Sequence, residues 1–218
     1  DTVGVGGAAA DAEMIAMAAE AMTAAGLGPG EFAIKVNTRR LLNGVLDAIR
    51  ANSPEARLTV LRALDKLDRL GIEGVADLLG QGRMDASGDF TRGAGLAPAD
   101  VDRVLAFAQA GRASRGQTLS ALEAACGDSE EGRAGLEELA AIDALVAALG
   151  ASEDAVQFDP SIVRGLEYYT GPVFEAELLI DTPDEKGRPA RFGSVGGGGR
   201  YDGLVARFRA EPAPATGF

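Results

Sequence analysis

Histidine and tryptophan are absent from the 218 residues, and cysteine occurs once, at Cys126. Without histidine, this chain alone cannot build a Ser-His-Asp or Cys-His catalytic centre or a histidine-ligated zinc site. A single cysteine cannot form a disulfide within the chain, which fits a reducing compartment, and we expect Cys126 to be a buried free thiol. We therefore expect a cytoplasmic protein whose chemistry uses other side chains.

Long uncharged apolar runs are also missing, since none approaches the ~18 residues of a membrane helix, and we expect no membrane contact. The net charge is -12, from 21 Lys and Arg against 33 Asp and Glu. This balance argues against broad, non-specific binding to nucleic acid, so any contact with RNA needs a local basic patch. The 46% hydrophobic and 25% charged residues are typical of a globular protein.

The two ends of the sequence are unusual for a complete protein. The chain starts at Asp1 rather than Met, and it stops in PAPATGF, which is typical of the opening of a strand. We therefore expect a piece of a longer polypeptide.

Strand patterns lie on both sides of a long helical stretch. Residues 32–36 (FAIKV) alternate in polarity, and 173–180 (VFEAELLI) and 190–196 flank a turn-like run at 182–189, which predicts a hairpin. The glycine-rich run at 196–204 comes next, and a short helix or strand is expected from there to Phe208. Shorter strand signals lie at 156–158 and 214–218. Because strands and helices do not alternate regularly, we predict an α+β fold with an antiparallel sheet.

Helical periodicity and capping residues predict the helices. Asp11 is expected to cap the first helix, and Gly71 to end the leucine-striped one that begins after Ser53. No strand is expected from 51 to 150, so this stretch is predicted to be all-helical. The predicted helices span 11–25, 38–50, 54–71, 98–108, 117–126 and 131–149.

The run RGLEYYTG at 164–171 is the first candidate for chemistry. Arg164 offers a permanently charged, planar donor group that suits a carboxylate or a phosphate. If this run is extended, Tyr168 and Tyr169 point to opposite faces, so one enters a pocket while the other packs. A surface arginine beside aromatic core residues explains the run equally well.

A second candidate is GGGGRYDG at 196–203. Glycines within a sheet allow a ligand or another backbone to approach closely. The run matches neither a dinucleotide-binding GxGxxG after a strand nor a phosphate-binding GxxxxGK loop. A flexible hairpin or bulge is the alternative, and Asp1 by itself is most simply a solvated carboxylate.

Together and in this order, these segments resemble histidyl-tRNA synthetase, a class II aminoacyl-tRNA synthetase. FDPSIVRGLEYYTGPVFEA at 158–176 is similar to that family's first histidine-specific signature, and GSVGGGGRYDGLV at 193–205 to its second. PATGF at 214–218 is similar to the start of class II motif 3, and DTVG at the beginning to the end of motif 2. The helical stretch matches the family's insertion domain in position.

The resemblance implies roles for individual residues. Arg164 matches the catalytic arginine that contacts the substrate carboxylate and the α-phosphate. Asp1 matches the acidic residue that faces the substrate imidazole, and Gly217 lies in the ATP-binding motif 3. The tyrosines and glycines that match the histidine pocket are Tyr168, Tyr169, Gly197, Gly198, Gly199 and Tyr201. Glu167 stands where the family usually has Asp.

Further expectations follow from the resemblance. It implies a partial catalytic core at 1–44 and 151–218, with a helical insertion domain at 45–150. The parent protein is expected to be a homodimer that uses ATP with Mg²⁺, L-histidine and tRNA(His), and the fragment alone is expected to be inactive because motif 1 and the arginines of motifs 2 and 3 lie outside it. Residues 45–150 carry 11 Lys and Arg against 17 Asp and Glu, so composition does not favour strong RNA binding there.

Two other classes of protein remain open. One is the synthetase-like regulatory subunit of ATP phosphoribosyltransferase, a binding module that usually lacks the insertion and departs from the RGLEYY signature. The other is a synthetase-like RNA-sensing domain of a larger signalling protein, in which the pocket residues tend to be lost. The insertion and Arg164 are both present here, which favours the enzyme.

Overall fold

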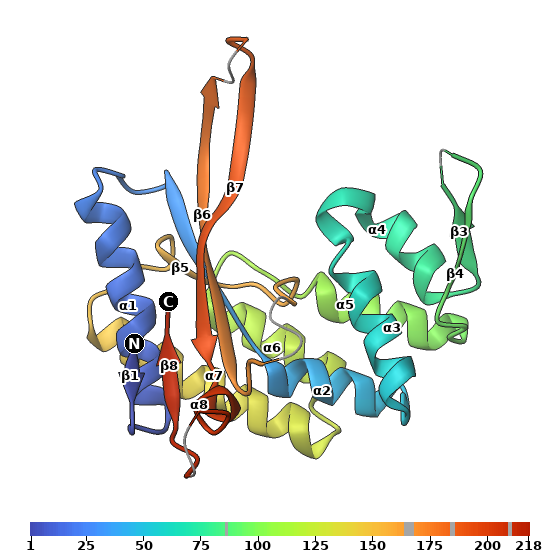
Figure 1. The fold of residues 1–218 in the computed structure, drawn as a ribbon, viewed down its shortest axis with the longest axis horizontal. Helices are drawn as coiled ribbons and strands as arrows, with labels where there is room; N and C mark the ends of the chain where they lie inside the picture. Colours follow the sequence, from blue (N-terminus) through green and yellow to red (C-terminus); the bar gives the residue numbers. More distant parts are fainter. Residues whose placement is uncertain (86, 164–167, 184–185, 209–210) are drawn as a thin grey trace.

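The computed structural model describes residues 1–218 except 86, 164–167, 184–185 and 209–210 (Figure 1). Six of the described strands form one sheet in the order β1-β8-β7-β6-β2-β5, with every neighbouring pair antiparallel except β2 and β5. The strands are β1 (Thr2–Val3), β2 (Phe32–Thr38), β5 (Val156–Phe158), β6 (Pro172–Pro183), β7 (Pro189–Arg200) and β8 (Ala215–Gly217). The predicted α+β class with a mainly antiparallel sheet is confirmed.

The two faces of the sheet differ in chemistry along β2. Ile34 and Val36 are 0% exposed and face α1 (Ala8–Ala24) and α7 (Glu130–Ala148), which cover one side of the sheet. Because successive side chains of a strand alternate, Lys35 points to the other side. There its ammonium pairs with Asp159 at 3.1 Å and Glu177 at 2.5 Å. One face is therefore core and the other is polar and available for a site.

A long hairpin formed by β6 and β7 rises well beyond the rest of the sheet (Figure 1). Its lower half pairs with β2 and β8, and register shifts interrupt the β6–β7 ladder above Ala176 and above Leu178. The predicted hairpin is confirmed, but the glycines at 196–199 belong to β7 itself. The second strand was predicted to end at 196, and it continues to Arg200 because the facing residues of β6 supply the ladder partners.

Most of the remaining helices form a helical lobe on one side of the molecule, whereas the short helix at Asp202–Val205 lies beside β8 (Figure 1). Thr38, Ser53, Ser114 and Ser129 accept hydrogen bonds from backbone N–H groups two or three residues on, as N-cap residues do. The remaining helices, besides α1 and α7, are α2 (Arg39–Ala48), α3 (Pro54–Leu64), α4 (Leu67–Leu79), α5 (Pro98–Ala108), α6 (Arg115–Cys126) and α8 (Asp202–Val205). The predicted boundary at 44/45 falls inside α2, and α7 packs along α1 and α2.

Two predictions for the helical stretch are wrong. The leucine-striped segment is not one helix ending at Gly71, because α3 ends at Leu64 and α4 continues to Leu79 across a kink at Gly71, whose φ of 66° suits glycine. The stretch also contains a hairpin of β3 (Gly82–Met84) and β4 (Phe90–Arg92). The carboxylate of Asp85 accepts hydrogen bonds from the N–H groups of Ser87 and Asp89 and holds the turn.

Asp11 does not cap the first helix, which begins three residues earlier, after Gly7. Its carboxylate is 1% exposed and pairs with the guanidinium of Arg200 in β7 through two contacts of 3.0 Å. Burial raises the pKa of Asp11, and Arg200 opposes this shift. The acidic residue that the sequence offered as a cap therefore joins α1 to the sheet.

Cys126 is a free thiol that is 0% exposed, as expected. Burial raises its pKa to about 12, and nearby Asp128 adds to the shift. Among the described residues, no helix combines the length and apolar character that crossing a membrane requires.

Candidate functional site: a tyrosine-lined cavity on the polar face of the sheet

Four residues of neighbouring strands lie in one row across the sheet, and two of them, Gly199 and Gly217, are predicted site residues. Gly217 in β8 lies opposite Gly199 in β7, Gly199 opposite Val173 in β6, and Val173 opposite Asn37 in β2. The carboxylate of Asp1 lies against Gly217, where a Cβ would collide with it. Residues from the two ends of the chain therefore meet on one line.

Asp1 and Tyr201 are in direct contact. The Tyr201 hydroxyl donates a hydrogen bond of 2.7 Å to Oδ1 of Asp1. The backbone N–H of Tyr201 donates to the carbonyl of Ala215 at 2.8 Å, which fixes the position of the Tyr201 backbone. The pair combines an acceptor-only carboxylate with a phenol, the two groups that the resemblance assigned to one pocket.

A cavity of about 460 Å³ lies on the polar face between β6, β7 and the two adjacent tyrosines. This size falls in the usual range for small-molecule sites. It is lined by Ile162, Tyr168, Tyr169, Val173, Phe174, Glu175, Ser194, Val195, Gly196, Gly197 and Gly198.

Tyr168 and Tyr169 both line this cavity. Neither residue lies in a strand, so the condition under which they were expected to point to opposite faces is not met, and the ring centroids lie 4.3 Å apart at 47°. Burial raises the pKa of Tyr169, and its hydrogen bond with Tyr168 adds to the shift. The Tyr169 hydroxyl therefore keeps its proton at neutral pH and can donate it in a hydrogen bond.

The glycines of β7 are needed for two different reasons. A Cβ on Gly198 would lie 2.7 Å from Cζ of Phe174 and would also collide with the carbonyl of Gly217. A Cβ on Gly199 would lie 2.9 Å from the ring of Tyr169. In contrast, the space at Gly197 is open, with nothing nearer than 3.7 Å, and this residue lines the cavity. Two glycines allow close packing, and one leaves room for a ligand.

Arg164, the predicted catalytic residue, lies outside the described residues, so its role stays a prediction. The chain on either side reaches the cavity, through Ile162 before it and Tyr168 after it. Asp1, Tyr201 and Gly217 meet at the end of the row described above, whereas Tyr168, Tyr169, Gly197 and Gly198 line the cavity itself. Gly199 packs directly beneath Tyr169.

Glu175 is a cavity residue that the sequence analysis missed. Its side chain is 6% exposed and lies two residues from Val173 on the same face of β6. The signal was available, because two charged residues, Glu175 and Glu177, interrupt the otherwise apolar strand VFEAELLI. Glu175 and Ile162 also line an adjoining cavity of about 240 Å³, which reaches Asp65 and Asp68 at the α3–α4 junction.

The family model for histidyl-tRNA synthetase matches residues 1–218, the whole chain. The chain belongs to the histidyl-tRNA synthetase family. The histidine–tRNA ligase of Caulobacter vibrioides is 58% identical over 219 residues, and that of Brucella ovis is 56% identical over 221. Both matches cover 100% of this chain and 44% of the relative, so the chain spans less than half the length of these curated relatives.

Solved structures of the family agree with the fold. A histidyl-tRNA synthetase from Nostoc has a TM-score of 0.76 at 26% identity and covers 98% of this chain and 45% of its own. An ATP phosphoribosyltransferase regulatory subunit/histidyl-tRNA synthetase from Bacillus halodurans has a TM-score of 0.73 at 26% identity, over 98% of this chain and 48% of its own. The class II synthetase core is therefore confirmed, and the regulatory alternative is not better supported.

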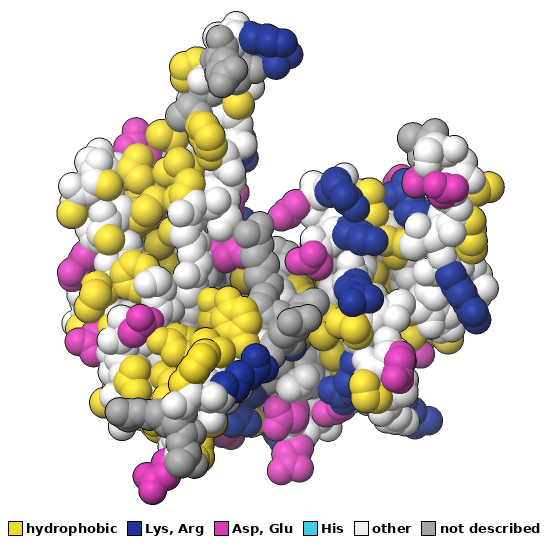
Figure 2. All heavy atoms as spheres, viewed as in Figure 1, with side chains coloured by type: hydrophobic (Ala, Val, Ile, Leu, Met, Phe, Trp, Pro, Cys, Tyr) yellow, Lys and Arg dark blue, Asp and Glu magenta, His cyan; other side chains and the backbone are white. Residues whose placement is uncertain are grey.

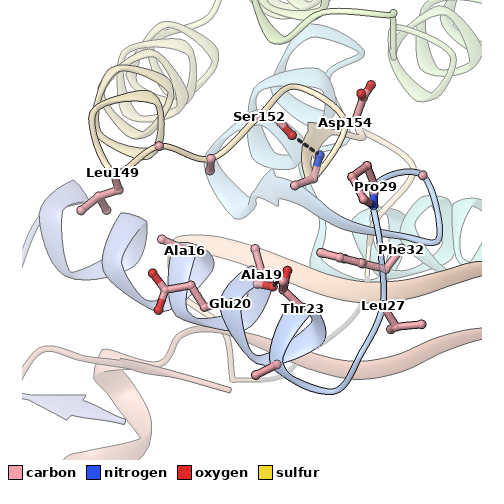
Figure 3. A pocket seen from close by; sticks show the side chains of 15 residues that line it. Ala16, Ala19, Glu20, Thr23, Leu27, Pro29, Phe32, Leu149, Ser152 and Asp154 are labelled. Carbon is pink, nitrogen blue, oxygen red and sulfur yellow. Dashed lines mark hydrogen bonds between the residues drawn. The ribbon is translucent and has the colours of Figure 1, made fainter.

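A larger hollow of about 530 Å³ lies between α1 and the loop after α7 (Figure 3). Its wall consists mainly of alanine and other apolar or small residues, and its charged side chains are Glu20 and Asp154. Ser152 is engaged locally, since its hydroxyl accepts a hydrogen bond of 3.1 Å from the N–H of Ala155. This hollow shares no residue with the tyrosine-lined cavity, and none of the positions that match the synthetase signatures lines it.

No all-protein magnesium site is evident among the described residues of this chain. Among the described residues, no group of three or more Asp, Glu, Cys or His side chains converges in a way that could hold a metal ion. Mg²⁺ commonly uses one or two carboxylates together with substrate phosphates, and such a site needs ATP itself.

Proposed function

We propose that the full-length protein activates L-histidine with ATP to form histidyl-adenylate and then transfers the histidyl group to tRNA(His). The observation that carries this proposal is the contact between Tyr201 and Asp1 beside a tyrosine-lined cavity, in a chain of the histidyl-tRNA synthetase family. The curated relatives bear the name histidine–tRNA ligase.

Recognition of the imidazole ring follows from its hydrogen-bonding groups. A neutral imidazole offers one N–H donor and one nitrogen acceptor. Asp1 accepts from the N–H, and a tyrosine hydroxyl of the cavity donates to the other nitrogen. A site that hydrogen-bonds a substrate in this way rejects analogues without the group by a factor of roughly 10⁴–10⁵, so specificity for histidine needs no editing. The open space at Gly197 lets the substrate lie against the strand.

Activation is an in-line displacement. A carboxylate oxygen of histidine bonds to the α-phosphorus of ATP, the bond from that phosphorus to the bridging oxygen breaks, and pyrophosphate leaves with the electron pair. Arg164 contacts both the carboxylate and the α-phosphate, so a fixed cation stands where negative charge builds up. The backbone around Gly217 approaches ATP. Positioning and charge neutralisation carry the reaction, and no protein histidine is needed.

Transfer to tRNA follows from the same intermediate. A ribose hydroxyl at the end of tRNA(His) attacks the histidyl carbonyl, the mixed anhydride bond breaks, and AMP leaves. Basic side chains gather along the edge of the helical lobe that faces the sheet (Figure 2), although residues 45–150 carry 11 Lys and Arg against 17 Asp and Glu. This edge supplies the local basic patch that an acidic protein needs to approach RNA.

The remaining parts of the proposal concern the parent protein. It is a cytoplasmic homodimer in which residues 45–150 form an insertion domain between two parts of the catalytic core, 1–44 and 151–218. Mg²⁺ enters on the phosphates of ATP, and the steps above use only side chains of this chain. The isolated fragment is inactive because its relatives are more than twice as long.

Histidine-dependent exchange of pyrophosphate into ATP tests the proposal. The full-length protein should catalyse exchange with histidine and not with other amino acids, and residues 1–218 alone should not. A full-length protein that binds histidine and activates ATP phosphoribosyltransferase, but lacks exchange, would instead support the regulatory function for which the Bacillus halodurans protein is named. Exchange by the isolated chain would refute the prediction that the fragment is inactive.

A further inference from the structure

Asn37 lies on the polar face of β2, in the row that ends at Asp1. Its side chain is 1% exposed, and the register places it opposite Val173, a residue of the tyrosine-lined cavity. The amide nitrogen Nδ2 donates to the carbonyl oxygen of Pro160 at 3.1 Å and to that of Ile162 at 2.9 Å. Both amide hydrogens are therefore used on one short segment, residues 160–162.

That segment connects the sheet to the predicted catalytic arginine. Ile162 lines the tyrosine-lined cavity and stands two positions before Arg164 in the sequence. We propose that Asn37 is a positioning residue: it fixes residues 160–162, which include the cavity wall at Ile162 and stand just before Arg164 in the sequence. This inference rests on the proposed synthetase function.

Among the described residues, further contacts hold the beginning of this segment, and the N–H of Ile162 donates to the carbonyl of Asp159 at 3.2 Å. The N–H of Asp159 donates to the carbonyl of Val36 at 2.9 Å, and the Asp159 carboxylate pairs with Lys35 at 3.1 Å. The same carboxylate accepts from the N–H and hydroxyl of Ser161 at 3.0 and 2.5 Å. From β2, Asn37 reaches furthest along the segment, because it bonds the carbonyl of Ile162.

An amide suits this task for a chemical reason. The two carbonyl oxygens of the segment are acceptors, and a neutral amide presents two donors from one rigid group. An aspartate of the same shape would place oxygen against oxygen, and an apolar residue would leave the carbonyls unsatisfied. Asn37 does not line the cavity, so it acts through the segment and not on the substrate. A shift of about 1 Å in a reacting group lowers the rate about 10²-fold.

The first experiment compares Asn37→Asp, Asn37→Ser and wild type in the full-length protein by histidine-dependent pyrophosphate exchange. Both Asn37 variants should lower kcat, Asn37→Asp by about 10²-fold, while the KM for ATP changes much less, since the loss is in the transition state. Asn43→Ser in α2 is the matched control. Asn43 accepts from Arg57 at 3.5 Å, so this variant should keep the wild-type kcat. Equal kcat values for Asn37→Asp and wild type would overturn the proposal.

A double-mutant cycle with Arg164→Ala separates positioning from a general loss of structure. In the Arg164→Ala background, Asn37→Ser should lower kcat by a much smaller factor than it does in the wild-type background, because the arginine that depends on this positioning is already missing. Fully additive losses would contradict the proposal.

Amide hydrogen exchange supplies a readout that does not depend on activity. Asn37→Ser should speed exchange in a peptide covering 159–163 and leave α7 unchanged. Faster exchange throughout α7 and β2 would show that Asn37 stabilises the whole core. Unchanged exchange in every peptide would show that Asn37 does not fix residues 160–162. Either result overturns the inference. If the wild type lacks pyrophosphate exchange, the proposed function fails, and amide exchange still decides whether Asn37 fixes the segment.

Discussion

Tyr201 and Asp1 are joined by a hydrogen bond of 2.7 Å from the tyrosine hydroxyl to Oδ1 of the carboxylate, although they stand at opposite ends of the sequence. The bond holds the carboxylate in place with one oxygen still available to accept from a ligand. Replacing Tyr201 by Phe removes the bond and keeps the ring. We expect the KM for histidine to rise about tenfold, the effect of losing one hydrogen bond to a charged group.

Steady-state pyrophosphate exchange by the full-length protein measures this effect. The control is Phe192→Leu, an exposed position on the distal part of β7, which should leave the KM unchanged. A KM for histidine that stays constant in Tyr201→Phe would show that this pair does not contribute to binding.

The buried pair of Asp11 and Arg200 predicts a large effect on stability. Asp11→Asn removes the negative charge beside the guanidinium of Arg200, which is 6% exposed as a residue and whose other described partners are the carbonyl of Gly7 and the part-exposed Asp202. Removing one partner of a buried ion pair costs about 3–5 kcal/mol. We therefore expect a clear fall in the unfolding temperature of the full-length protein, measured by scanning calorimetry.

The matched control for this variant is Asp47→Asn. It breaks the more exposed pair with Arg57, and such pairs contribute about 0–1 kcal/mol. Similar unfolding temperatures for the two variants would mean that the Asp11–Arg200 pair adds little to stability.

Neighbouring glycines of β7 should respond differently to the same change. Gly198→Ala places a Cβ 2.6 Å from Cβ of Phe218 and 2.7 Å from the Phe174 ring, so we expect β7 and β8 to separate and the unfolding temperature to fall. Gly197→Ala meets nothing within 3.7 Å, so it should keep the unfolding temperature. Because its methyl group enters the ligand cavity, Gly197→Ala should raise the KM for histidine. The opposite order of stabilities would contradict this division of roles.

Cys126 should be unreactive in the folded protein. Burial raises its pKa to about 12, so the thiolate that attacks disulfide reagents is scarce at pH 8. We expect labelling by dithionitrobenzoate only after unfolding, whereas an introduced thiol at the exposed position Val195 (Val195→Cys) should react at once. Immediate labelling of Cys126 in the native protein, located by mass spectrometry, would contradict its burial.

The same shift sets a direction for stability against pH. The folded state keeps the thiol protonated beyond the ordinary pKa of about 8.5, whereas the unfolded state loses the proton. The contribution of Cys126 is therefore complete below pH 8.5 and declines as the pH rises toward 12. Cys126→Ala should weaken this decline in unfolding temperature between pH 8.5 and 10.

Local signals predicted most of the fold. Alternation in FAIKV gave β2, the strand pattern of VFEAELLI gave β6, and Ser53-Pro54 gave the start of α3. The starts of α6 and α7 were placed at 117 and 131, slightly late, because Ser114 and Ser129 were not identified as their caps. Asp11 misled the prediction because its true partner, Arg200, lies 189 positions away. The β3–β4 hairpin was missed because its strands have three residues each, and the turn around Asp85 and Ser87 decides the structure more than they do.

The sequence predicted which residues belong to the candidate site better than it predicted how they are arranged. The resemblance selected Asp1, Tyr168, Tyr169 and Tyr201, but the assumption of an extended chain put the adjacent tyrosines on opposite faces. Asn37 and Glu175 were missed because each sits in an apolar strand, where polarity alone does not reveal which face bears a cavity.

The pairing of β1 with β8 places Thr2 opposite Thr216. The strands β2 and β6 are neighbours in the sheet, although the whole helical lobe lies between them in the sequence. During synthesis on the ribosome, the helices between 39 and 148 emerge and can pack before the strands that follow them exist. Asp1 can contact Tyr201 only after 200 further residues have been synthesised. Such non-local pairing slows folding, so the contact between Asp1 and Tyr201 forms only after the helices between 39 and 148 are available to pack.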